Sequence, residues 1–252
     1  DMLKLFGNVD LLCYAQSLPN VQTSGELDAG LHIEGCDNAH NEMSLNGVPV
    51  HNAAHLLGFF SVFNASHYAQ MRFSPTALSA GNANRLGGFV DLCSPDTISR
   101  RFAAEGSVGL ISSQATLHVP IGTKSELTLS GRLAYINLLY HQLLRMREMA
   151  LKYGFYDANL TWTYRLDSNN TLRIDYYSGQ DNGELNDMVS VYDGKLKWNN
   201  YLGALHWTRR MGRATLQQTA YLSAYGNEFS TSFQNIHLRL PSSITDWGYK
   251  AH

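Results

Sequence analysis

Residues 41–64 read NEMSLNGVPVHNAAHLLGFFSVFN, and this stretch decides how the rest of the chain is interpreted. Asn46-Gly47 stands between apolar residues, and both members of the pair tolerate positive φ, so the pair predicts a tight hairpin turn. The run at 56–63 that follows is the most hydrophobic of the sequence. On these residues alone, a small α/β domain with one tight turn explains the stretch.

Composition excludes several classes of protein. The chain has 252 residues, a net charge of -2, only 16% charged residues and 14 tyrosines. Such a chain lacks the excess of positive charge that attracts nucleic acid. Its composition favours a polar, aromatic-rich β protein. No apolar run reaches the roughly 18 residues of a membrane helix, but barrel strands are shorter and alternate. Residues 1–20 contain no signal peptide, so an exported protein is expected to be present here as a mature piece or an internal fragment.

Cysteine and histidine spacing predicts no metal site. Cys13, Cys36 and Cys93 form no C-x-x-C pair, which argues against thiolate zinc. Their odd number leaves at least one thiol unpaired. Two interpretations stay open: Cys36 and Cys93 form a disulfide, or all three cysteines are small, partly buried hydrophobic residues. His51 and His55 have i, i+4 spacing, but the residues between them include no acid and H-E-x-x-H is absent.

After residue 100 the pattern changes to an alternation of apolar and polar residues. Its clearest example places apolar residues at Tyr156, Ala158, Leu160, Trp162, Tyr164 and Leu166, with Asp157, Asn159, Thr161, Thr163 and Arg165 between them. Segments of about ten such residues are typical of transmembrane barrel strands, although the strands of a soluble β-sandwich alternate too.

The predicted connections favour the barrel. Those at 121–125, 167–170 and 211–213 are short, whereas those at 136–154, 179–195 and 226–235 are long. Outer-membrane barrels alternate tight periplasmic turns with longer external loops in this way. We therefore interpret 136–152 as an ordered external loop.

The first hundred residues resemble a known family. L-N-G-V-P-V-x-N followed by H-L-x-G-F-F-S-V-F-N resembles the plug domain of TonB-dependent outer-membrane receptors of the Bacteroidetes type, usually written L-D-G-V-P-V-Y-N. V-D-L-L-x-x-A-Q-S-L-P-N-V-Q at 9–22 and R-L-G-G at 85–88 match further motifs in family order. Glu34 and Cys36 depart from the family, which has Arg and Gly there, as do Asn82 and Ala83.

The resemblance implies a mixed α/β plug domain at residues 1–97, followed at 98–252 by antiparallel strands of a transmembrane β-barrel. About eight strands fit in the second part, whereas such receptors have roughly 22 around their plug. The chain is therefore expected to be a fragment. The plug's structural motif would consist of Gly35, Asn46, Gly47, Pro49, Arg85, Gly87 and Gly88.

The resemblance also implies a function, which is energised uptake of a nutrient across the cell outer membrane. The nutrient would be an oligosaccharide, a siderophore, cobalamin or a peptide. Expected partners are the TonB-ExbB-ExbD complex, outer-membrane lipid and a surface lipoprotein, with no nucleic acid and no cofactor. Substrate-facing loops would supply His51, Asn52, His55, Ser79, Asn82 and Asn84. The sequence contains no candidate catalytic set, so an enzyme is not expected; the alternative is a non-transporting β-rich binding or structural module, or a decayed receptor paralogue.

Burial can be predicted in both halves. The interior of the first should contain Leu45, Val48, Leu57, Phe60 and Val90. One continuous outer face of the second should carry Tyr156, Leu160, Trp162, Tyr164, Leu172 and Ile174. The opposite face, with Asp157, Asn159, Arg165, Arg173 and Asp175, should look into a polar lumen or at the plug.

Overall fold

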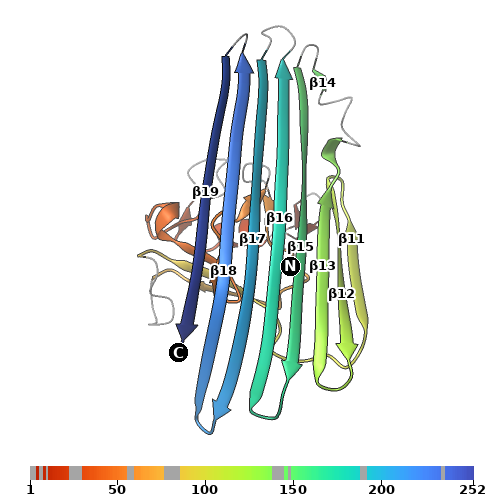
Figure 1. Cartoon of the computed structure of the whole chain (residues 1–252), viewed down its shortest axis with the longest axis vertical. Helices are drawn as coiled ribbons and strands as arrows, with labels where there is room; N and C mark the ends of the chain where they lie inside the picture. The colour runs from red at the N-terminus through yellow and green to blue at the C-terminus, as the bar shows by residue number, and fades with distance from the viewer. Residues whose placement is uncertain are drawn as a thin grey trace.

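The protein consists of a small N-terminal part and a large antiparallel sheet, with the N-terminal part lying against one face of the sheet (Figure 1). The computed structural model describes residues 4–5, 8–9, 11–22, 30–55, 60–76, 86–137, 145–146, 149–187, 192–233 and 236–252. Among these, no helix is long and apolar enough to cross a bilayer.

The N-terminal part is built from short elements. In chain order they are β1 Lys4–Leu5, β2 Asn8–Val9, α1 Leu11–Gln16, β3 Val21–Gln22, β4 His32–Ile33, the 3-10 helix η1 Asn38–His40, β5 Glu42–Leu45, β6 Val48–Pro49, β7 Ala54–His55, β8 Phe60–Ser61, β9 Gln70–Ser74 and β10 Phe89–Cys93. Its central sheet has the order β6-β5-β10-β9. Strand β10 runs parallel to β5 and antiparallel to β9, so the sheet is mixed.

The turn predicted at Asn46-Gly47 is present. Leu45 pairs with Val48 across it, and the φ angles of Asn46 and Gly47 are 51° and 77°. The sequence of the turn therefore sets the register of β5 and β6, as expected for a two-residue hairpin with both central residues in the left-handed region.

Replacing Gly47 by Ala should lower the free energy of unfolding by about 1–2 kcal/mol, because a Cβ disfavours the left-handed conformation. Nothing lies within 4 Å of the added Cβ, so the cost would come from the backbone alone. Gly203→Ala is the matched control, since Gly203 has equal space and no positive φ. Chemical denaturation of both variants measures the difference, and equal stabilities would contradict the expectation.

The R-L-G-G motif ends at two glycines that allow close approach. A Cβ on Gly88 would collide with the buried side chain of Ile33, and one on Gly87 with the side chain of Asn41. The same Asn41 side chain donates to the backbone oxygen of Leu31 and accepts from the backbone N–H of Gly88 at 2.7 Å. These glycines thus let β10 pack directly on the segment that contains β4; Arg85 of the motif lies outside the described residues.

The N-terminal core agrees with the prediction where it can be checked. Leu45, Val48 and Val90 are buried, whereas Leu57 and the side chain of Phe60 lie outside what the structure describes. The same core cluster extends into the large sheet through Tyr177, Leu202 and Ala204. The two parts of the protein therefore share one apolar core.

The large sheet follows the chain in sequence. Its strands are β11 Ala103–Val108, β12 Ser112–Ile121, β13 Ser125–Ala134, β14 Arg145–Met146, β15 Met149–Arg165, β16 Asn170–Asp187, β17 Tyr192–Met211, β18 Ala214–Phe233 and β19 Ile236–Ala251. Their order is β11-β12-β13-β15-β16-β17-β18-β19, with β14 beside β15, and neighbours are antiparallel. Sequential antiparallel pairing was predicted.

The predicted long connections are wrong in extent. Most of 179–195 belongs to β16 and β17, most of 226–235 to β18, and β15 already begins at Met149 within the expected loop. The reason is that the residues on the outer face change from apolar to polar about halfway along each of these long strands. On β16 they run from Leu172, Ile174 and Tyr176 to Gln180, Asn182 and Glu184, while backbone pairing continues unchanged.

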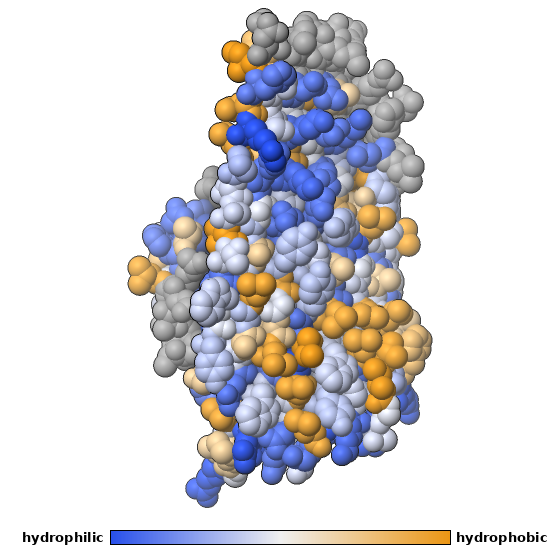
Figure 2. Space-filling model, viewed as in Figure 1, coloured by the Kyte–Doolittle hydropathy of each residue, from blue (hydrophilic) through white to orange (hydrophobic). Residues whose placement is uncertain are grey.

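The two faces of the sheet have the predicted residues. Tyr156, Ile174 and Tyr176 are exposed on the outer face, whereas Asp157, Asn159 and Asp175 are buried on the inner one. Figure 2 shows hydrophobic residues gathered over the lower half of the outer face, with hydrophilic ones above and at the lower tip. We call this hydrophobic region the apolar belt. Its exposed members include Leu117, Ile121, Leu133, Leu205, Trp207, Leu222, Trp247 and Tyr249.

Candidate functional site

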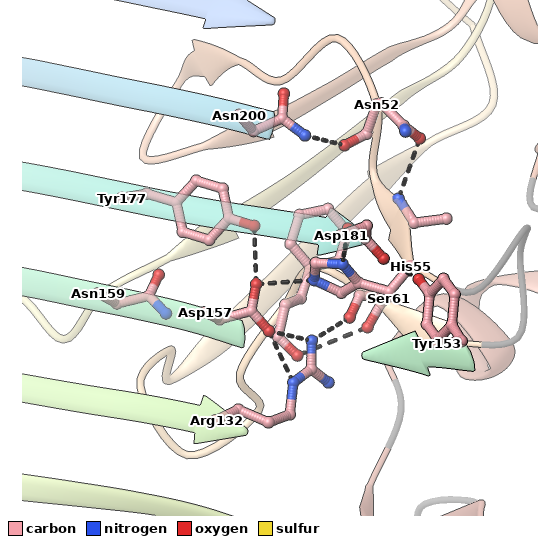
Figure 3. A network of polar contacts seen from close by, with 12 residues as sticks. Asn52, His55, Ser61, Arg132, Tyr153, Asp157, Asn159, Tyr177, Asp181 and Asn200 are labelled. Carbon is pink, nitrogen blue, oxygen red and sulfur yellow. Dashed lines mark hydrogen bonds and ion pairs between the residues drawn. The ribbon is translucent and has the colours of Figure 1, made fainter. Parts of the chain in front are cut away.

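The most concentrated polar contact between the two parts is centred on His55. This residue belongs to β7, which pairs with β8, and its side chain points at the inner face of β15 and β16 (Figure 3). Its Nε2 lies 2.7 Å from Oδ1 of Asp157 and its Nδ1 lies 2.5 Å from Oδ2 of Asp181. The imidazole is 1% exposed, so both ring nitrogens are used inside the protein.

Asp157 collects donors from three sides. Besides His55, it accepts from the Tyr177 hydroxyl at 2.9 Å and from Arg132, whose Nε and Nη2 lie 2.8 and 2.6 Å from Oδ2. Arg132 also donates to the backbone oxygen of Ser61 in β8. The guanidinium therefore connects strand β13 to β15 and to the N-terminal part at once (Figure 3).

Aromatic rings pack against one side of this network. The His55 ring stacks on Phe155 with 4.3 Å between centroids and 8° between planes, and Arg132 lies 5.1 Å from the centroid of the same ring. The Tyr153 hydroxyl donates to Asp181. Because the rings exclude water, the charges act in a low local dielectric, where pairing is strong and an unpaired charge is costly.

The charge state of His55 follows from its neighbours. Burial by itself lowers the pKa of His55, but the carboxylates of Asp157 and Asp181 outweigh it and raise the pKa from 6.5 to about 9. His55 is therefore an imidazolium at neutral pH. One buried cation on the N-terminal part is thus held between two carboxylates of the sheet, and Arg132 adds a second cation to Asp157.

His67 has the opposite state. Burial lowers its pKa from 6.5 to about 4, which Asp175 opposes and His118 reinforces. Its neutral ring lies 3.0 Å from the Thr161 hydroxyl and 2.8 Å from that of Ser130. His67 therefore links the N-terminal part to β13 and β15 through hydroxyl groups and carries no charge at neutral pH.

The stability of the contact should fall at alkaline pH. A raised pKa in the folded state means that the contribution of His55 is fully present below about pH 6.5 and is lost as the pH rises through about 9. Guanidinium denaturation at pH 7 and pH 10, followed by tryptophan fluorescence, would show this loss. His55→Gln should lose less between the two values; an equal decrease in both proteins would contradict the role of His55.

Further hydrogen bonds extend the contact along the strands. Tyr68 donates to Asn159 at 3.0 Å, Asn46 to Asp175 at 2.9 Å, and the Ser66 hydroxyl lies 2.5 Å from that of Thr116. Asn200 on β17 donates to the backbone oxygen of Asn52 at 2.8 Å, and Ser223 on β18 to that of Pro49 at 2.7 Å. Lys250 on β19 donates to the backbone oxygen of Gly47 at 3.0 Å, so the N-terminal part is bonded to strands from β12 to β19.

Three of the six predicted substrate-facing residues lie in the part that the structure describes. His51 and Asn52 are half-buried beside the sheet, His55 is buried within the contact, and Ser79, Asn82 and Asn84 lie outside the described residues. Sequence reasoning placed Asp157 on the inner face but missed Arg132 and Asp181. Asp181 was hidden because the polar stretch around it looked like a loop.

This arrangement fits a structural contact better than catalysis. His55 has carboxylates on both ring nitrogens, which leaves neither free to act on a hydroxyl nucleophile. Within the described ranges, no cluster of three His, Cys, Asp or Glu side chains could hold a metal ion. The network can hold the N-terminal part against the large sheet, and breaking its ion pairs would release this contact.

No protein-family model matches the sequence. No curated protein matches it either. Among solved structures, the outer membrane transporter YddB from Escherichia coli matches over 98% of this chain and 43% of its own, with a TM-score of 0.67 and 12% identity. The ferric enterobactin receptor PfeA of Pseudomonas aeruginosa matches over 97% and 43%, with a TM-score of 0.64 and 13% identity. The fold of this chain is thus similar to part of the fold of these two outer-membrane proteins.

The copper transporter OprC agrees, with a TM-score of 0.57 and 10% identity over 94% of this chain and 48% of OprC. Identities this low concern the fold alone. The chain spans less than half the length of each of these proteins. All three are named as transporters or receptors and none as an enzyme, and the large sheet corresponds to part of the transporter fold.

Proposed function

We propose that this chain forms the plug domain and the first barrel strands of a TonB-dependent receptor in the cell outer membrane. The observation that carries the proposal is a sequential antiparallel sheet with an apolar belt on its outer face and the N-terminal part bonded to its inner face. A sheet exposed to lipid needs an apolar outer face, and a barrel lumen is polar or filled by a plug. The likeness to outer-membrane transporters supports the same interpretation.

In this proposal residues 1–97 are the plug and residues 98–252 the start of the barrel, as in receptors of the Bacteroidetes type. The substrate is a nutrient that contacts the plug through His51, Asn52, Ser79, Asn82 and Asn84, while the buried His55 holds the plug to the wall. TonB-ExbB-ExbD would supply the energy, and a surface lipoprotein would assist capture. Turns at 122–124, 166–169 and 212–213 would face the periplasm, because short turns do so in such barrels.

The polar halves of the long strands carry charged pairs that are suited to water. At the end opposite the short turns, Glu184 lies 3.7 Å from both Lys152 and Lys195 on the neighbouring strands, and Arg239 pairs with Glu228 at 2.6 Å. Charged pairs this far from the apolar belt belong in water, so in this proposal the polar halves of the strands extend beyond the bilayer on the side opposite the short turns.

The test uses the complete protein that contains this chain, expressed in a Gram-negative host. It should fractionate with the outer membrane and need detergent to stay soluble, and uptake of its substrate should stop when TonB is removed. A detergent-free soluble protein would favour the alternative of a β-rich binding module. A membrane-bound protein whose uptake does not depend on TonB would contradict the energised mechanism.

A further inference from the structure

A cavity of about 620 Å³ lies between the N-terminal part and the inner face of the large sheet. Its walls include the Asn46-Gly47 turn, strands β9 and β10, the β15–β16 turn at Ser168 and Asn169, and the lower parts of β16–β18. The cavity is therefore at the short-turn end of the strands, away from the residues that we propose to contact substrate. Its size is within the usual range for small-molecule sites.

Positive charge is concentrated on the wall of this cavity. Five cationic side chains line it, Arg72, Arg165, Arg173, Arg210 and Lys250, against the two carboxylates Asp91 and Asp96. Lys250 is paired with Glu42 at 3.8 Å, so the four arginines against two carboxylates leave an excess of two positive charges, although the whole chain has a net charge of -2. The distribution of charge thus singles out this place in an otherwise slightly acidic protein.

The two carboxylates leave three of the four arginines without an ion pair among the residues that the structure describes. Asp91 accepts from the Ser44 hydroxyl at 2.7 Å and from the Gly47 N–H at 2.8 Å, and Asp96 is 81% exposed and pairs with Arg173 at 3.3 Å. Throughout the described part of the chain, no carboxylate forms an ion pair with Arg72, Arg165 or Arg210. Three guanidinium groups from β9, β15 and β17 thus remain available to a ligand.

The remaining wall is hydrophilic. Threonine, serine, asparagine and glutamine side chains make up much of it, and Phe89 is one of the few large apolar residues. Arg173 has a buried Nε–H with no hydrogen-bond partner among the residues described. Such a wall offers many hydrogen-bond donors to a ligand that is rich in acceptors.

We propose that this cavity binds a small hydrophilic molecule that carries several carboxylate or phosphate groups. The planar guanidinium group matches both oxyanions with paired hydrogen bonds, and separate arginines can hold separate anionic groups. The proposal goes beyond uptake, because it predicts binding at the end that would face the periplasm whether or not the same molecule is the transported substrate. It needs only the cavity and its charges.

Calorimetric titration of the complete protein in detergent tests the proposal, with citrate and inorganic phosphate as probes. Citrate should bind more tightly than phosphate, since it can reach several arginines. Loss of a charged hydrogen bond corresponds to about tenfold in affinity or more, so Arg165→Gln with Arg210→Gln should raise the citrate Kd about a hundredfold. Raised salt should weaken binding to the original protein.

Arg209→Gln is the matched control, because Arg209 neighbours Arg210 on β17 but faces the other side of the sheet and does not line the cavity. Its citrate Kd should stay unchanged. Arg72→Gln, on the N-terminal part, should weaken binding without altering the sheet. The proposal is overturned if the original protein binds neither probe, if Arg209→Gln weakens binding as much as the double variant, or if only an acidic peptide binds. Membrane fractionation and uptake are measured separately, so failure here is distinguishable from failure of the transport proposal.

Discussion

Asp157→Asn is expected to lower the free energy of unfolding by about 3–5 kcal/mol, the cost of breaking a buried ion pair while leaving its partner charged. The Asp157 side chain is 0% exposed and Arg132 only 2%. In the variant, Arg132 would keep the Ser61 oxygen but lose its counter-charge, and His55 would keep only Asp181. Guanidinium denaturation of the complete protein measures the change.

Two further variants separate charge from shape. Asp193→Asn removes a carboxylate that is exposed on β17 and forms no ion pair within the described ranges, so it should change stability by less than about 0.5 kcal/mol. Adding Arg132→Met to Asp157→Asn removes the cation that faces position 157 and should restore part of the loss. If Asp157→Asn is as stable as Asp193→Asn, the network does not hold the two parts together.

Leu160→Arg should cost about 2–4 kcal/mol if the apolar belt lies in lipid, which is the range for a cation at the middle of a barrel's outer face. Leu160 lies in the apolar half of β15, with Leu129 beside it on β13 and Tyr176 on β16. An arginine at this position would be surrounded by hydrocarbon, which cannot solvate its charge. Refolding into lipid vesicles over a range of urea concentrations measures the cost.

The matched control for this prediction is Asn186→Arg on β16, in the polar half of the sheet. An arginine there would remain in water, so it should cost about 0–1 kcal/mol. Equal behaviour of the two variants would place both positions in the same solvent. The belt would then be part of a water-exposed or protein-covered surface, as in the β-rich module that is the alternative.

Prediction from sequence succeeded where one local rule controls the result. The Asn46-Gly47 pair gave the hairpin and its register, because few residues accept positive φ. The alternation from Tyr156 to Leu166 gave the two faces of β15, because a pleated strand places successive side chains on opposite sides. Both rules act over a few residues and need no knowledge of the rest of the fold.

Prediction failed where the result depends on distant segments. The extent of β16–β18 was underestimated, since a strand that is polar on both sides of its backbone has the composition of a loop. The His55 contact was missed because its members come from β7, β13, β15 and β16, and only the folded chain brings them together. His55 was expected at a substrate-facing surface, and no local signal reveals two carboxylates that are 102 and 126 residues away.

The length of the central strands has one more consequence. Strands β16–β18 contain 18 to 20 residues each, about twice the 9–11 that cross a bilayer, so about half of each would stand above the membrane as paired backbone. Such a rim is already ordered before anything touches it. A molecule that binds to this rim would immobilise side chains but few backbone dihedrals, so the protein would lose little conformational entropy on binding.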